Sequence, residues 1–155
     1  MATTYKLGMD AVILYQTPAV DNPSTLTPSS MTELTNVRDV TINHETGEAD
    51  VTTRGNQGWR ATAATLRECS VEFEMVWKPG DTGFEAIKNA WLNSSEISLA
   101  VLSGDPDDSE AEGPVGNFSI TNFSRSEPLE EAITVSVTAK LSAWGKWHNA
   151  SGQQT

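Results

Sequence analysis

The clearest pattern in the chain is a strict alternation of apolar and polar residues near its C-terminal end. From residue 133 to 143, apolar side chains occupy every odd position, and Thr, Ser or Lys occupies every even one. Successive side chains of a strand point to opposite faces, so this pattern predicts a long strand with one face in a core and one in water. Residues 70–77 repeat it: Val71, Phe73, Met75 and Trp77 point inward, and Ser70, Glu72 and Glu74 point outward.

Four further segments have strand character, namely residues 11–16, 37–43, 96–104 and 117–125. The apolar phase slips twice, between Ala63 and Ala64 and again between Ile120 and Phe123. One extra residue at a β-bulge absorbs such a slip, so we expect a bulge at each place.

One segment has the period of a helix. Phe84, Ile87, Trp91 and Leu92 recur at helical spacing, which predicts a helix over residues 82–93 with these side chains in the core. Thr82 with Glu85 three residues later has the form of a capping box.

Two polar stretches interrupt the strands. Residues 17–36 are rich in Pro, Ser and Thr and indicate an arm that docks on a neighbouring molecule, while residues 44–58 indicate a long hairpin excursion. We therefore expect an N-terminal strand and arm at 1–36, a β domain at 37–144 and a flexible tail at 145–155. The fold class is mainly β (α+β): a β-sandwich or bent antiparallel sheet with one flanking α-helix.

The bulk composition narrows the function classes. The chain has 155 residues, which favours one domain, and 10 Lys plus Arg against 21 Asp plus Glu give a formal charge of −11. Such acidity lacks the cationic footprint of backbone-driven DNA binding. We find no leader and no stretch of about 18 apolar residues, so we expect a soluble protein outside the secretory path. The single cysteine, Cys69, reads as a small buried hydrophobe.

Candidate chemistry is sparse, and we expect neither enzyme activity nor a cofactor. His44 and His148 lack further ligands at metal spacing and are expected to be solvated. Asp105, Asp107 and Ser109 imitate the start of a calcium loop, but Glu110 stands where the loop needs glycine. Glu72 and Glu74 are spaced like a hydrolytic pair, although a solvated strand face explains them better.

The tryptophans leave a second function class open. Five of them, Trp59, Trp77, Trp91, Trp144 and Trp147, suggest a carbohydrate-binding or adhesin-type sandwich as an alternative. Trp77 and Trp91 lie in phase with core residues, which weakens this alternative. Trp144 and Trp147 are expected after the last strand, where an exposed aromatic side chain more often anchors a neighbouring subunit.

Three stretches together resemble the phage major tail tube protein family. They are residues 37–77 with Gly58-Trp59-Arg60, the turn–helix–strand at 80–102, and residues 118–144 with Pro128-Leu129-Glu130-Glu131 before the final strand. Residues 6–16 are similar more loosely. The resemblance implies subunits that close into hexameric rings, and rings that stack into a β-barrel tube through which DNA leaves the capsid.

The resemblance also implies roles for particular residues. Residues 45–58 would reach the adjacent ring and be disordered in a free monomer; the candidates there are Glu45, Glu48, Asp50, Thr53, Arg54 and Asn56. Candidate lumen carboxylates, which would repel DNA, are Asp39, Glu72 and Glu74, and Glu45, Glu48 and Asp50 also qualify. Candidate inter-subunit residues are Glu130, Glu131 and Trp144.

The partners implied are further copies of the chain, the tape measure, the tail terminator and baseplate or tail-tip proteins. DNA would pass without specific binding, and no membrane partner is implied. The place implied is the virion tail, assembled in the host cytoplasm. A tube subunit of a related secretion or injection machine is a near alternative.

Overall fold

A single antiparallel sheet of seven strands, in the spatial order β2-β1-β5-β6-β7-β4-β3, dominates the computed structural model, which describes residues 7–107 and 110–149. The strands are β1 (Val12–Gln16), β2 (Thr32–Glu33), β3 (Val37–Asp50), β4 (Thr62–Val76), β5 (Glu96–Leu102), β6 (Glu112–Ser126) and β7 (Thr134–Asn149). The helices are α1 (Thr82–Leu92) and the short 3-10 turns η1 (Gly8–Asp10), η2 (Pro23–Thr25), η3 (Pro28–Ser30) and η4 (Arg54–Asn56). This confirms the predicted mainly β fold with one α-helix, in its bent-sheet form.

The alternating segments form the main core. Val71, Phe73 and Met75 of β4 are buried beside Val135 and Val137 of β7, as predicted. Helix α1 covers this face, and its Phe84 and Ile87 are fully buried in the same cluster. One face of an antiparallel sheet is thereby buried while the other stays in water.

Strands β4 and β6 both carry the predicted bulge, but on β4 it lies just after Ala64 rather than between Ala63 and Ala64, which pair with consecutive residues of β3. On β4, Arg67 pairs with Thr46 but Ala64 pairs with Glu48, so β4 carries one extra residue there. On β6, the pairs of Ile120 and Asn122 with consecutive residues of β7 leave Thr121 as the extra residue. Such bulges bend a strand and increase its twist.

Residues 17–36 are not a free arm. Their Leu26 and Met31 are buried against Ala100 and Leu102 on the second face of β5, where they form a separate core cluster. The prediction of an arm that docks on a neighbour is therefore wrong for this part of the segment, because its few apolar residues find an apolar face within the same chain. β1 and β2 likewise belong to the common sheet rather than to a separate unit.

A closed hydrogen-bond network holds this segment in place. Ser98 Oγ donates to Asn117 Oδ1 at 2.7 Å, and Asn117 Nδ2 donates to the Val20 carbonyl oxygen at 2.7 Å. The Val20 amide donates back to Ser98 Oγ at 3.3 Å. These two buried polar side chains are thus satisfied where polar burial would otherwise be costly.

Helix α1 starts and packs slightly differently from the prediction. Its N-cap is Asp81, not Thr82: Asp81 Oδ2 accepts from the Phe84 amide at 3.1 Å, and Glu85 Oε1 accepts from the Gly80 amide at 3.3 Å. The side-chain hydrogen bond from Lys88 and, after it, the hydrogen bond from the Gly80 amide lower the pKa of Glu85. The helix is therefore capped by a side chain with a reciprocal bond to Glu85, as predicted, but the cap residue is one position before Thr82.

The predicted core position of Trp91 is wrong. Trp91 is 42% exposed and Leu92 is 58% exposed, while Ala90 is buried in their place. Trp91 does share a helical face with Phe84, but in the last turn it reaches past the core. There one side of its ring stacks on Phe123, with ring centroids 5.8 Å apart and planes at 19°, and the rest is open.

The predicted tail at 145–155 is also wrong as far as residue 149, because β7 continues to Asn149; residues 150–155 lie outside the described residues. A register shift at Gly145 hides this continuation from a simple alternation. His148 is consequently buried in β7, with Nε2 3.3 Å from the carbonyl oxygen of Pro106, so its predicted solvation is wrong. Trp147 donates from Nε1 to Glu112 at 3.1 Å.

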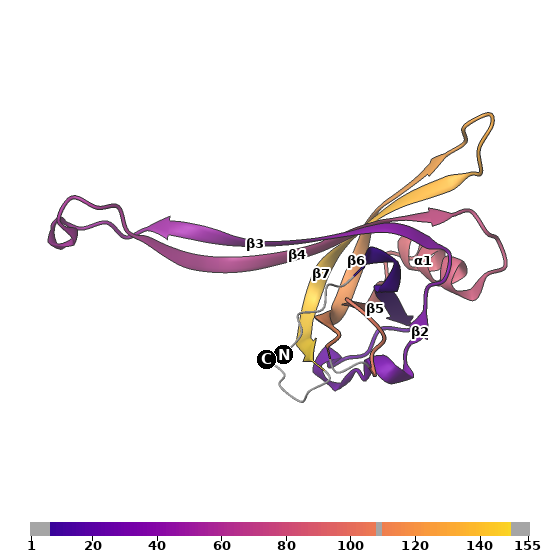
Figure 1. Ribbon diagram of the computed structural model, residues 1–155, viewed down its shortest axis with the longest axis horizontal. Helices are drawn as coiled ribbons and strands as arrows, with labels where there is room; N and C mark the ends of the chain where they lie inside the picture. Colours follow the sequence, from indigo (N-terminus) through magenta and orange to yellow (C-terminus); the bar gives the residue numbers. More distant parts are fainter. Residues whose placement is uncertain (1–6, 108–109, 150–155) are drawn as a thin grey trace.

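The overall shape is a body with two projecting hairpins (Figure 1). β3 and β4 leave the body as a long two-stranded ribbon, which we define as residues 45–68, and its tip is residues 51–61. This confirms the predicted long hairpin at residues 44–58. The β6–β7 hairpin projects in another direction, away from the ribbon.

The helix register predicts unequal effects of two truncations. Ile87→Ala should lower the free energy of unfolding by about 2–5 kcal/mol, because it empties a fully buried site. Leu92→Ala, the matched control, should change it by no more than about 0.5 kcal/mol. Urea denaturation of the unassembled subunit measures both, and equal losses would mean that the helix is placed wrongly.

Candidate assembly surfaces

The half of the sheet formed by β3, β4, β7 and the distal part of β6 presents a continuous polar face. One row across the four strands reads Thr41, Glu72, Thr138 and Asn122, and the next includes Glu74, Ser136 and Ser124. Directly paired residues of neighbouring strands lie on the same face. The predicted alternation of inward and outward residues therefore extends across all four strands. We call these four paired strands, β3, β4, β7 and residues 120–126 of β6, the wall.

Carboxylates outnumber cations in a hollow at the end of this face where the β3–β4 hairpin leaves the body. The hollow has a volume of about 430 Å³, and its charged lining residues are Glu45, Glu68, Glu72, Arg67 and Lys140. On the same face, a carboxylate oxygen of Glu74 forms an ion pair with a guanidinium nitrogen of Arg38, 3.7 Å away. A pair this exposed contributes little to stability, so the charges are free to serve another purpose.

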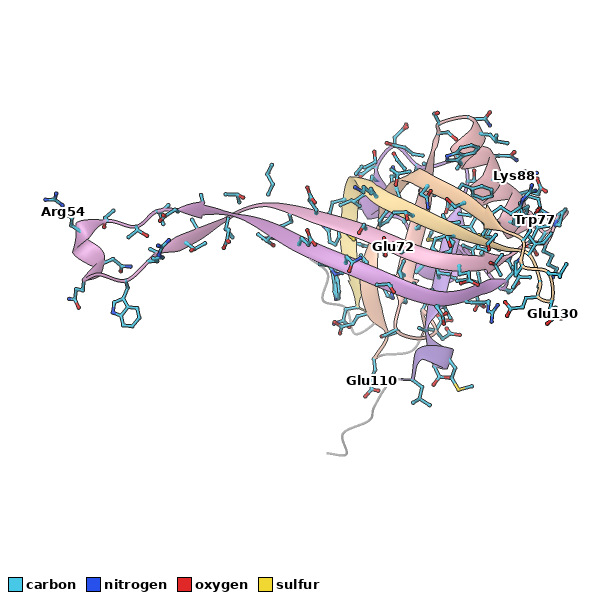
Figure 2. The ribbon with its side chains drawn as sticks, turned by 90° about the horizontal axis from the view of Figure 1, so that it is seen from above. Arg54, Glu72, Trp77, Lys88, Glu110 and Glu130 are labelled. Carbon is cyan, nitrogen blue, oxygen red and sulfur yellow. The ribbon has the colours of Figure 1, made fainter. Side chains whose placement is uncertain are left out.

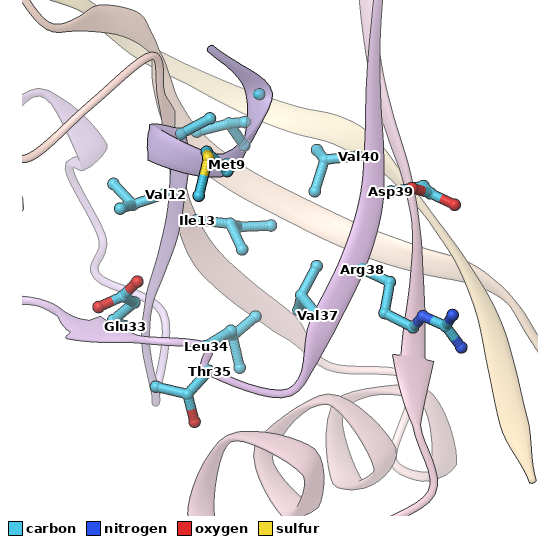
Figure 3. Close-up of a pocket in the computed structure, with 13 residues that line it drawn as sticks. Met9, Val12, Ile13, Glu33, Leu34, Thr35, Val37, Arg38, Asp39 and Val40 are labelled. Atoms are coloured by element: carbon cyan, nitrogen blue, oxygen red, sulfur yellow. The ribbon is translucent and has the colours of Figure 1, made fainter. Parts of the chain in front are cut away.

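The predicted lumen carboxylates separate into two sets. Glu72 and Glu74 lie on the polar face of β4, and Figure 2 shows Glu72 there. Asp39 lies in an irregular stretch of β3 between Val37 and Val40, where the register shifts. Its side chain is exposed and points away from the apolar side of β3 (Figure 3).

The candidate inter-ring residues also divide. Glu45, Glu48 and Asp50 belong to β3 and pair with β4, so the expected unstructured loop at 45–58 is wrong for residues 45–50. The hydroxyl of Thr52 donates to Asp50 Oδ1 at 2.6 Å and its amide at 2.9 Å, and these two bonds lower the pKa of Asp50.

Thr53, Arg54 and Asn56 lie in the tip, where Asn56 Nδ2 donates to the carbonyl oxygen of Trp59 at 2.9 Å. The tip contains Arg54 and Arg60 and no acidic residue, in a chain of net charge −11. Trp59 there is 75% exposed, and Leu66 of the adjoining β4 is 83% exposed. An isolated two-stranded ribbon is marginally stable in water, so these exposed apolar groups favour a binding role for the ribbon.

Of the strand edges that are unpaired within the described chain, two flank the polar face; the outer side of β2, the other end strand of the sheet, lies away from it. β3 pairs with β4 on one side and with no strand on the other. β6 pairs with β5 through residues 115–119, while residues 120–126 pair with β7 alone. We call the outer sides of β3 and of residues 120–126 the free edges. They flank the polar four-stranded wall on opposite sides and expose unpaired N–H and C=O groups.

A groove with an apolar inner side and a polar rim runs along the β3 edge on the side away from the polar face; we call it the apolar groove. It lies between β3 and the η1–β1 segment and has a volume of about 770 Å³. Met9, Ile13, Val37 and Val40 point into it, and its rim includes Glu33, Thr35, Arg38 and Asp39 (Figure 3). Met9 is 86% exposed and Val40 is 39% exposed. The groove marks where the two ends of the sheet approach each other without pairing.

The structure does not bring the three candidate inter-subunit residues together. Glu130 and Glu131 are exposed in the β6–β7 loop beside Leu129, which is fully exposed. Glu130 and Arg54 mark opposite ends of the molecule (Figure 2). Trp144 lies far along β7, opposite Gly116, and is 45% exposed.

The sequence did not identify the groove residues or Leu92 as candidates for contacts between subunits. Apolar Val40 sits in a half-buried strand pattern, which predicts burial, and its exposure depends on the distance between β1 and β3. The one indication of this exposure is that β3 is an end strand, paired with β4 on one side and with no strand on the other.

Within residues 7–107 and 110–149, no group of His, Cys, Asp and Glu is placed to hold a metal ion. Asp105 Oδ1 accepts from the Asp107 amide at 2.9 Å in a local turn, and Ser109 of the calcium-like pattern lies outside the described residues. Cys69 is buried as predicted, and burial raises the pKa of its thiol. In the described chain, no helix has the length and apolarity needed to cross a membrane.

Sequence comparison defines the class of protein to which this wall and these edges belong. A sequence model of the phage tail tube protein family matches residues 8–144, and the chain therefore belongs to that family. The protein is a structural, non-enzymatic tail tube subunit and a component of the particle's tail. This membership also decides against the carbohydrate-binding alternative. No curated protein matches the chain.

Solved structures share the fold. The tail of an empty gene transfer agent (GTA) particle, refined with C6 symmetry, is 17% identical over 97% of this chain and 98% of that chain, with a TM-score of 0.67. The SPP1 tail tube is 18% identical over 94% and 80%, with a TM-score of 0.67. A protein of the native GTA virion is 17% identical over 90% and 95%, with a TM-score of 0.64.

Proposed function

We propose that copies of this subunit join edge to edge into a ring and that rings stack into the conduit through which DNA leaves the particle. In each joint, the free edge of β3 pairs with the free edge of β6, residues 120–126, of the next subunit. The observation that carries this proposal is the pair of free edges on opposite sides of one four-stranded wall. Pairing them satisfies both rows of backbone groups at once.

The strand directions suit this joint. β3, β4, β7 and β6 alternate in direction, because each neighbouring pair is antiparallel. β3 and β6 therefore run in opposite directions, and a β3–β6 joint between subunits related by rotation about the tube axis is antiparallel as well. Such a head-to-tail interface makes a closed ring when its rotation closes. The C6 symmetry recorded for the similar GTA tail supports six subunits, each giving four strands to a common barrel.

The polar face becomes the wall of the bore. The opposite face is already covered by α1, β1 and β5, so the polar face is the one left to meet water inside the ring. Glu72 and Glu74 then line the bore, and Asp39 contributes at its margin. A basic wall would bind every phosphate through counterion release and hold the DNA, whereas carboxylates repel it. DNA passes without specific binding.

The ribbon makes the contact between rings. Its basic, aromatic tip projects beyond the body, and an exposed tip with two arginines suits an acidic copy of the same chain. The tip residues make this contact, namely Thr53, Arg54 and Asn56. The ribbon residues behind the tip lie next to the contact, namely Glu45, Glu48 and Asp50. Glu130, Glu131 and Trp144 remain candidates for contacts between subunits. Tape measure, tail terminator and baseplate or tail-tip proteins complete the tail, which assembles in the host cytoplasm.

Cryo-electron microscopy of the purified protein at increasing concentration tests the proposal. We expect rings or hollow tubes in which β3 of each subunit pairs with β6 of the next, and Glu72 and Glu74 face the bore. A monodisperse monomer at all concentrations would contradict assembly. A tube with a neutral or positive inner wall would reassign the acidity to solubility.

Removing the ribbon should separate ring formation from stacking. Residues 46–67 are replaced by Asn-Gly, because Glu45 and Glu68 already face each other and a two-residue turn joins such strands. We expect a subunit of unchanged thermal stability that forms rings without tubes. Trp59→Ala, which keeps the ribbon, should give shorter tubes. Full-length tubes from the truncated protein would refute the inter-ring role.

A further inference from the structure

No segment of the described chain fills the apolar groove beside β3. The position of the groove beside a free edge indicates which part of a neighbouring subunit could fill it. We infer that the C-terminal turn of helix α1 of the neighbouring subunit, through Trp91 and Leu92, docks into this groove. The inference rests on the edge-to-edge ring proposed above and adds to it a side-chain interface on the outer side of the barrel wall.

The two surfaces flank the two free edges on the same side of the sheet. The groove opens beside the β3 edge, on the face that carries the core: Val40 pairs with the buried Phe73. Trp91 lies beside the β6 edge on the core face as well, since it stacks on Phe123 of that edge segment. When the edges pair, whatever lies beside one edge meets whatever lies beside the other on that face.

The levels along the strands also agree. One row of directly paired residues crosses the wall from Val40 through Phe73 and Val137 to Phe123. It begins at the groove and ends under the ring of Trp91. In a ring joined row to row, the Val40 end of one subunit therefore meets the Phe123–Trp91 end of the next.

Both surfaces are apolar and open to water in the single subunit. Leu92 is 58% and Trp91 42% exposed on the helix, and Met9 is 86% and Val40 39% exposed at the groove. Burying such side chains against each other is favourable by about 25 cal/mol per Å² of apolar surface. A head-to-tail contact needs two different, mutually fitting patches on one molecule, and these patches meet that need.

The inner side of the groove offers an apolar surface to an occupant. Its volume of about 770 Å³ lies within the range of pockets that enclose ligands larger than an indole ring. Three charged residues line its rim, and their side chains turn away from the interior. Arg38 and Asp39 point to the other side of β3, and Glu33 points away from β3 (Figure 3); Arg38 reaches Glu74 at 3.7 Å. Met9, Ile13, Leu34, Val37 and Val40 are left to face the interior, while Val12 points to the opposite side of β1 and packs against the second core cluster.

Cross-linking of the full-length protein tests this contact. Met9→Cys and Leu92→Cys are combined in one chain, because both side chains are exposed and their replacement spares the core. The protein is assembled, treated with a short bis-maleimide and separated under denaturing conditions. The native Cys69 is buried and remains unreactive. We expect a ladder of covalent oligomers up to the full ring.

The matched control combines Met9→Cys with Ser136→Cys. Ser136 is exposed on the polar face, on the opposite side of the wall, so it cannot reach the groove. We expect at least tenfold less cross-linked product than from the first pair. Well-formed rings in which the two pairs react equally, or neither reacts, would overturn the docking of α1 while leaving the ring intact. Failure of the unmodified protein to form rings would overturn the proposed function and this inference together.

Discussion

The structure depends on one constraint: long strands whose backbone groups are bonded on one side only. β3 is fourteen residues long and has a single partner strand, and the distal part of β6 has the same deficit on the other flank of the wall. Exposed N–H and C=O rows of this length attract other chains, and proteins normally shorten, charge or cover such edges. Here the edges stay long and are matched in direction, and in the proposed ring further copies of the chain satisfy them.

The remaining features follow from the need to make a curved wall with two different sides. Alternation along β4 and β7 gives one apolar and one polar face. Helix α1, together with strands β1 and β5, buries the apolar face. Bulges at Thr121 of β6 and between Ala64 and Arg67, within the ribbon near its base, bend the strands that form the two hairpins. The second face of β5 would be left open, and residues 17–36 cover it through Leu26 and Met31.

Local patterns in the sequence predicted those parts of the fold that local physics determines. The two-residue period placed Val71, Phe73, Met75, Val135 and Val137 in the core and put Glu72 and Glu74 on the open face. Its slips indicated a bulge on each of β4 and β6, the one on β4 a little before its actual place. Tertiary partners decided the rest. Trp91 has the helical phase of a core residue, yet the core ends before it. His148 and Trp147 appeared to follow the last strand, because the register shift at Gly145 disguised its continuation. The apolar groove depends on how closely β1 approaches β3, and no local pattern encodes that distance.

Backbone hydrogen exchange of the dilute subunit and of the assembled protein tests the central claim most directly. The account predicts that slow exchange appears on assembly in β3 and in residues 120–126, while β5, which is paired on both sides, is protected in both states. Exchange in both free-edge segments that does not change on assembly would show that copies of the chain do not join through these backbone edges.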